Sequence, residues 1–273
     1  MTDENNVEGA AKAVKGILEA VPVYQDVVQP AAKEVGVALQ TVAKTVHLLL
    51  APISGLVWGY DQVKEFVGTR VAEKLRKVPE ERLRTPEPNI AGPTLESLRY
   101  TGHKEDLREL YASLLATAMD AETMAQAHPA FVEIIRQLSP DEAKIMRGLA
   151  YSGAEAFVDV RDHQDTPPVG GHWVLKYFSL VPYNVDCANP EFGPTYVVNL
   201  QRLGLIELRE NYRLNPRHGI DQYKLLRDHP IIKALIEKIS KESGHRADIS
   251  EGAIHLTPLG HQFCNACIYE LRG

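Results

Sequence analysis

The stretch VGVALQTVAKTVHLLLAPISGLVWGYDQVKEFV, residues 35–67, decides the fold class expected for this chain. Its apolar residues recur in alternating steps of four and three, which is the heptad spacing of a helix that packs against other helices. These seam residues are Val35, Leu39, Val42, Val46, Leu49, Ile53, Leu56, Tyr60, Val63 and Val67, continued by Val71, Leu75 and Val78. Pro22, Pro30 and Pro52 each remove a backbone donor, so a kink or break is expected there. We therefore predict a mainly α protein with long amphipathic N-terminal helices, which form an arm over residues 1–78.

The centre of the arm holds a candidate interaction surface. Residues 45–60 contain no Lys, Arg, Asp or Glu. As a helix they would span about 24 Å, which is short of the ~30 Å hydrocarbon core of a membrane. The run therefore favours a packed helix, and conditional membrane contact is the alternative. The candidate interaction or membrane residues are Val46, Leu49, Leu50, Ile53, Gly55, Leu56, Trp58, Gly59 and Tyr60.

The rest of the chain is expected to form two further parts. Residues 79–138 hold a proline-rich linker, up to about residue 95, and then a helical body. Residues 139–273 are expected to form a winged-helix-like domain with a small β-wing. This domain opens with Ser139-Pro-Asp-Glu142, a capping box at the start of a helix.

The winged-helix expectation depends on the order of elements after residue 190. A helix that ends at Gly204, a strand, a second strand and a last helix follow one another, as in a winged helix-turn-helix. Residues 157–190 hold turn signals and are expected to be irregular. A helical insertion lies at about 210–250, and its amphipathic helix begins at Pro230.

DNA binding is not favoured, because the net charge is -6 and DNA recognition needs a basic surface. The helix in the recognition position offers only Asn199, Gln201 and Arg202 for base or phosphate contacts. These three are the nucleic-acid candidates, and a protein–protein or structural use of the domain is the stronger hypothesis.

No enzyme motif stands out. The histidines lie mostly in expected turns and outside known hydrolase, zinc-protease or phosphate-loop motifs. Cys264 and Cys267, with His261 and Cys187, form only a weak zinc signal, because a C-x-x-C inside an amphipathic helix is usually a pair of buried residues. We therefore expect no catalytic residues, no cofactor, no metal and no small-molecule substrate.

Two stretches carry a family resemblance. NIAGPTLESLRYTGHKEDLRELYASLLATAMD (89–120) and AHPAFVEIIRQLSPDEAKIMRGL (127–149) resemble the signature of the bacterial Abi-alpha (abortive infection alpha) family. VPEERLRTPEPNIAGP (78–93) and NLQRLGLIE (199–207) are similar too. The resemblance implies defence against bacteriophage by arresting or killing the infected cell. It implies no established catalytic activity.

The leading hypothesis is thus an anti-phage protein whose arm binds a protein partner, another copy of the chain or, on activation, a membrane. Three cysteines and an acidic, polar start favour a cytoplasmic location, with peripheral membrane contact when the protein is activated. Two alternatives remain open. One is a winged-helix regulator associated with DNA, and the other is a homo-oligomeric helical scaffold.

Overall fold

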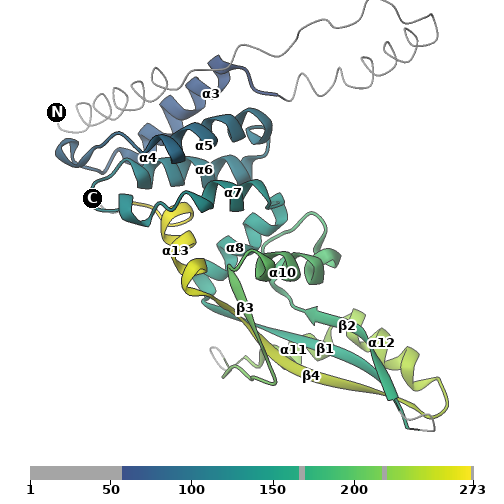
Figure 1. Ribbon diagram of the computed structural model, residues 1–273. Coiled ribbons are helices and arrows are strands. Elements are labelled where there is room, and N and C mark those ends of the chain that lie inside the picture. Colours follow the sequence, from purple (N-terminus) through teal and green to yellow (C-terminus); the bar gives the residue numbers. More distant parts are fainter. Residues whose placement is uncertain (1–56, 166–169, 217–219, 272–273) are drawn as a thin grey trace, which may run out of the picture. The chain divides into compact units, whose positions relative to one another are not determined.

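The computed structural model describes residues 57–165, 170–216 and 220–271, which belong to two compact units (Figure 1). Unit 1 comprises Met1–Gln137 with Tyr269–Gly273, and unit 2 comprises Leu138–Ile268. Six of the predicted interaction residues therefore lie outside the described residues: Val46, Leu49, Leu50, Ile53, Gly55 and Leu56.

The described part of unit 1 consists of helices and short helical turns. In chain order these are α3 (Tyr60–Phe66), a π-helical turn (Val67–Val71), α4 (Ala72–Leu75), a 3-10 turn (Glu80–Arg82), α5 (Pro88–Thr101), α6 (Glu105–Ala118), a second 3-10 turn (Met124–Gln126) and α7 (Ala130–Arg136). Helix α6 is buried on every side from Leu110 to Ala118, as expected for the central helix of a bundle. It contacts α4, α5 and α7, so the core of unit 1 forms around it.

The last part of the predicted seam is buried inside unit 1. Val63, Val67, Val71, Leu75 and Val78 are each at most 4% exposed. Helix α3 contacts α5, while the π-helical turn and α4 contact α6. The described end of the arm is therefore part of the core of unit 1.

The predicted linker is shorter than expected. Helix α5 begins at Pro88, where a proline sacrifices no helical hydrogen bond, and it runs through Pro93. The buried side chains of Ile90, Leu95 and Leu98 supply the packing that holds this helix in place despite the internal proline.

Unit 2 combines helices with one antiparallel sheet. Its elements are α8 (Pro140–Ser152), β1 (Ala154–Gln164), β2 (Gly170–Phe178), α9 (Val181–Asn184), a 3-10 turn (Pro190–Phe192), α10 (Gly193–Arg202), β3 (Ile206–Glu210), α11 (Gln222–Asp228), α12 (Pro230–Ser240), β4 (His245–Leu256) and α13 (Pro258–Cys267). The strand order is β2-β1-β4-β3. The described chain is thus mainly helical with a four-stranded sheet, and its winged-helix character stays a prediction.

The expectation of an irregular segment at 157–190 was wrong. Strands β1 and β2 occupy most of it and pair antiparallel, with His163 opposite Gly171 and Val158 opposite Phe178. Apolar and polar residues do not alternate clearly along β1, because Ala156 to Val160 are buried on both faces of the sheet. Gly170-Gly171 begins strand β2, and Pro167-Pro168 lies outside the described residues. The sheet of four strands is larger than the small wing that was expected.

One face of the sheet carries the apolar core of unit 2. Val158 and Val160 of β1 pack with Tyr223 and Leu226 of α11 and with Ile232 of α12. Helix α12 begins at Pro230, as its amphipathic pattern predicts, and contacts β4 and β1. Figure 1 shows α11 and α12 lying along the long strands β1 and β4.

Candidate functional site

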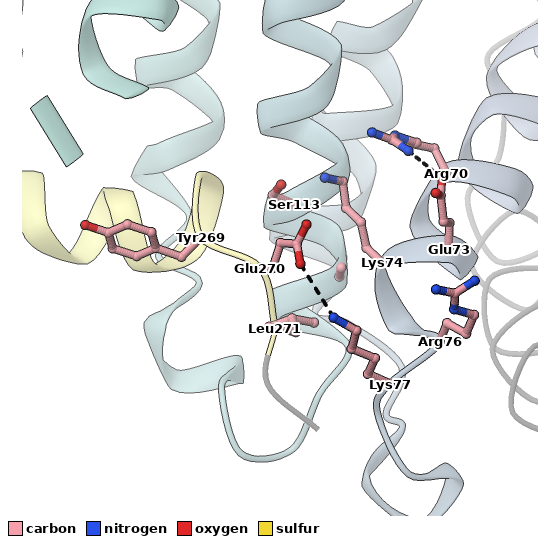
Figure 2. Close-up of a pocket in the computed structure, with 10 residues that line it drawn as sticks. Arg70, Glu73, Lys74, Arg76, Lys77, Ser113, Tyr269, Glu270 and Leu271 are labelled. Carbon is pink, nitrogen blue, oxygen red and sulfur yellow. Dashed lines mark hydrogen bonds and ion pairs between the residues drawn. The ribbon is translucent and has the colours of Figure 1, made fainter. Parts of the chain in front are cut away.

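A cationic pocket of about 210 Å³ lies in unit 1 (Figure 2). Four cationic side chains and two carboxylates line it, so cationic groups predominate. The lining residues are Arg70, Glu73, Lys74, Arg76, Lys77, Ser113, Ala116, Tyr269, Glu270 and Leu271. The four cations come from the end of the π-helical turn, from α4 and from the two residues after it, while Ser113 and Ala116 come from α6.

Two of the cations are committed to Glu109 of α6. Arg70 Nε donates to both carboxylate oxygens of Glu109 at 2.9 Å, and Lys74 Nζ lies 3.3 Å from Oε2. Arg70 also pairs with Glu73. Burial pushes the pKa of Glu109 upward, but the hydrogen bond from Arg70 and the charge of Lys74 outweigh this effect, and the pKa lies below its ordinary value. The same hydrogen bonds raise the pKa of Arg70.

The other cations are freer to meet a ligand. Lys77 Nζ lies 3.7 Å from Glu270 Oε2, in a pair whose two side chains are mostly exposed. Arg76 has no ion-pair partner among the described residues. Figure 2 shows Lys74 and Lys77 on one side of the pocket, with Ser113 and Glu270 across from them. A pocket in which cationic groups predominate favours an anion over a cation.

The sequence held part of the signal for this pocket. Arg70, Lys74 and Lys77 are spaced three and four residues apart, which places them on one helical face. The contributions of Ser113 and of the segment Tyr269–Leu271 are not visible from spacing, because they reach the pocket only through the tertiary fold.

Three predicted interaction residues of the arm are described. Trp58 is half-buried, and its backbone N–H donates to Arg99 O at 2.7 Å. Its indole ring lies edge-on to Phe66 with 5.5 Å between ring centroids. Gly59 is exposed, and so is Tyr60, which is 40% exposed. Trp58 thus packs within unit 1, whereas Tyr60 is open to solvent.

The three nucleic-acid candidates lie on α10, and one of them is used internally. Asn199 Nδ2 donates to Glu142 Oε1 at 2.7 Å, and its Oδ1 accepts from Arg202 Nη2 at 2.8 Å. Gln201 and Arg202 are exposed. Asn199 therefore joins α10 to the capping box of α8, a role that its sequence position did not reveal.

The three cysteines are buried thiols, and none forms a disulfide. Burial raises the pKa of Cys264 to about 12, and it raises the pKa of Cys267 as well. Cys187 Sγ contacts the carbonyl oxygen of Asp141 at 3.6 Å. These surroundings are those of small core residues rather than of thiolate ligands.

The described ranges also bear on whether a helix of this chain can cross a membrane. None of the helices found there combines the length and the apolar character that crossing requires.

Comparison with known proteins places most of the chain in one family. The family model described as Abortive infection alpha matches residues 59–267. A search of curated proteins found no match. A solved structure of an uncharacterized protein from the hydrocarbon-degrading marine bacterium Alcanivorax borkumensis SK2 is similar at 17% identity, covering 51% of this chain and 92% of that one. The two structures have a TM-score of 0.34.

Proposed function

Because this chain belongs to the abortive infection alpha family, we propose that it protects bacteria from bacteriophage by arresting or killing the infected cell. We further propose that it does so by binding through its N-terminal arm and without catalysis. The arm would bind a protein partner, a second copy of the chain or, once activated, a membrane.

The packing of the arm's described end is the observation that carries this proposal. Val63 and Val67 of the predicted seam are buried among the helices of unit 1. Trp58, at the beginning of the described residues, is attached to Arg99 through its backbone. Because the arm is joined to this core, a partner that binds the arm can change the packing of unit 1. The same seam spacing continues upstream through Ile53, Leu49 and Val46 in the sequence.

The test compares two charge substitutions in cells that carry the full-length protein. Leu49→Lys places a charge on the seam, whereas Ala51→Lys places the same charge in the same uncharged run but, at helical spacing, on the opposite face. Efficiency of plating and survival of infected cells are measured for each. We expect Leu49→Lys to abolish protection and Ala51→Lys to retain it. Full protection by Leu49→Lys would contradict the arm proposal.

Two further readouts separate the partners of the arm. Dye uptake after phage challenge reports on the membrane, and intact membranes during an effective response would exclude membrane contact. Light scattering of the purified wild type and of Leu49→Lys reports on self-association. Loss of oligomers in Leu49→Lys together with loss of protection would support a second copy as the partner. Monomers in both proteins would point to a different protein.

Removal of residues 1–78 is not a suitable test of the arm. The buried residues Val63, Val67, Val71, Leu75 and Val78 would be lost with it, and each belongs to the core of unit 1. Loss of several buried aliphatic side chains costs about 2–5 kcal/mol each, so the remainder is not expected to fold. Point substitutions upstream of residue 57 leave these five buried side chains in place.

A further inference from the structure

Three side chains that can ligate a metal ion converge near one end of the sheet of unit 2. Asp162 lies near the end of β1, His245 is the first residue of β4, and Glu242 lies in the turn between α12 and β4. One ligand atom from each residue lies within 4.8 Å of the other two. His245 Nδ1 is 2.8 Å from Asp162 Oδ1 and 3.8 Å from Glu242 Oε2.

Strand pairing places two of these groups on one face. Strands β1 and β4 are antiparallel, with Gln164 opposite His245 and Asp162 opposite Ala247. Residues opposite each other share a face, and so do residues two apart on one strand, so Asp162 and His245 are diagonal neighbours. Ala247 on this face packs against the apolar core beneath α11 and α12. The cluster therefore lies at the edge of a packed core, which fixes the backbone of both strands.

The charges at this position are unbalanced when the imidazole is neutral. The two carboxylates then carry a charge of -2, although the Asp162 side chain is only 9% exposed. Within the described chain, His245 is the only side chain that bonds to the Asp162 carboxylate. The nearby Lys241 is paired with Glu237 at 2.7 Å. A buried carboxylate without a compensating charge is costly, so the site favours a cation.

Helix α12 strengthens this preference. It ends at Ser240, two residues before Glu242. The C-terminal end of a helix carries partial negative charge from its last carbonyl groups, and a carboxylate at that position is unfavourable. A cation between Glu242 and Asp162 would relieve both the repulsion between the carboxylates and the repulsion from the helix end.

We propose that Asp162, Glu242 and His245 bind a divalent first-row transition metal, with Zn²⁺ as the representative ion. One imidazole and two carboxylates are ligands that such ions accept, and three protein ligands leave a fourth position for water. Bonds of about 2.0–2.2 Å in a tetrahedron separate the ligand atoms by roughly 3.3–3.6 Å. His245 and Asp162 therefore move apart and His245 and Glu242 move together, each by about half an ångström. His245 binds through Nδ1, and its proton resides on Nε2.

The competing explanation is an ion pair between protonated His245 and Asp162 that needs no metal. Both explanations predict that these residues stabilise unit 2, so stability alone does not separate them. Zinc binding does, because only the metal site requires Glu242 as a third group. Glu242 is 57% exposed, so its replacement by glutamine is not expected to disturb the fold.

The experiment titrates chelator-treated full-length protein with ZnCl₂ by isothermal titration calorimetry, with circular dichroism as the fold check. The wild type is expected to bind one zinc ion and to unfold at a higher temperature with zinc than without it. We expect Glu242→Gln and His245→Ala each to weaken zinc binding by about tenfold or more, because ligand loss leaves an incomplete site.

His163→Ala and His261→Ala are the matched controls. His163 lies on the opposite face of the same strands, where it faces Asp165 and Asp248, and His261 is exposed on α13. Both variants are expected to bind zinc within twofold of the wild type. Absence of saturable binding by the wild type would overturn the proposal. Unchanged affinity in a folded Glu242→Gln protein would overturn it too, as would an equal loss in His163→Ala.

Discussion

The guanidinium of Arg82 forms a two-bond ion pair with the buried carboxylate of Asp120, 38 residues further along the chain. Nε lies 2.9 Å from Oδ1 and Nη2 lies 2.5 Å from Oδ2. The Asp120 side chain is fully buried, and that of Arg82 is 15% exposed. Beside this pair, Arg84 N donates to Met119 O at 2.8 Å, so the segment after Pro79 is fastened to the end of α6.

Arg82→Met is expected to lower the free energy of unfolding by more than the loss of an exposed pair does, because it leaves the fully buried Asp120 carboxylate without its ion-pair partner. Urea denaturation followed by circular dichroism measures the change. Arg136→Met is the control, since Arg136 pairs with Glu133 on the surface and both side chains are more than half exposed. Exposed pairs contribute about 0–1 kcal/mol. Equal effects of the two substitutions would show that burial of Asp120 does not govern the stability of unit 1.

Asp141 makes the free energy of unfolding of unit 2 depend on pH. Its carboxylate accepts hydrogen bonds from Ala188 N at 2.8 Å, Asn189 N at 3.1 Å and Tyr196 Oη at 2.9 Å. Burial pushes the pKa of Asp141 upward, but these hydrogen bonds outweigh it and hold the pKa below its ordinary value of 3.8. A lowered carboxyl pKa stabilises the fold above the ordinary value, and that contribution is lost as the pH falls through the folded-state pKa.

Asp141→Asn is therefore expected to cost about 1–3 kcal/mol at pH 7. The difference from the wild type should shrink as the pH is lowered below 3.8, because protonation then removes the same charge from the wild-type protein. Denaturant unfolding at a series of pH values measures it. Glu96→Gln, at an exposed position of α5, should cost little at every pH. A constant penalty for Asp141→Asn across the series would contradict the assigned role of its charge.

Buried thiols give a third prediction. The raised pKa values of Cys264 and Cys267 and the burial of all three cysteines predict that the native protein reacts slowly with a disulfide reagent such as dithionitrobenzoate. Denatured protein should release three equivalents. Rapid release of one or two equivalents from native protein would show that the terminal C-x-x-C is accessible, and it would revive the zinc alternative for His261, Cys264 and Cys267.

Local signals in the sequence were sufficient for the elements that they control. Ser139 and Glu142 form the predicted capping box, with Ser139 N donating to Glu142 Oε2 at 2.6 Å and Glu142 N donating to Ser139 Oγ at 3.2 Å. The amphipathic helix predicted from Pro230 is α12. In both cases the interactions join residues a few positions apart, so the spacing of residues in the sequence is enough to predict them.

Features that depend on pairing between residues far apart in the sequence were not predicted. Phe157 packs closely against Gly252 on one face of β1, and Val158 is buried in the apolar core on the other face, so both faces are occupied and no alternation is visible. The cluster of Asp162 and His245 is invisible for the same reason. The two residues are 83 positions apart, and only the register of β1 with β4 brings them together.

The last prediction concerns the contact between Trp58 and Gly102. Trp58 lies in the described end of the arm, and Gly102 follows helix α5. A Cβ atom on Gly102 would lie 2.3 Å from Trp58 Cδ2, so only glycine leaves room for the indole there. Gly102→Val should displace Trp58 and cost about 1–3 kcal/mol through overpacking. Fluorescence in a Trp173→Phe background should shift to longer wavelength as the indole meets water. Gly92→Ala is the control, because a Cβ at Gly92 meets nothing within 4 Å.

The functional consequence follows from the anchoring of the arm. If attachment through Trp58 couples the arm to unit 1, Gly102→Val should reduce protection against phage while the protein remains folded, and Gly92→Ala should not. Plating assays at a temperature where circular dichroism shows both variants folded measure this. Full protection by Gly102→Val, together with a red-shifted Trp58 emission, would contradict this coupling. It would show that residues upstream of Trp58 act without the contact between Trp58 and unit 1.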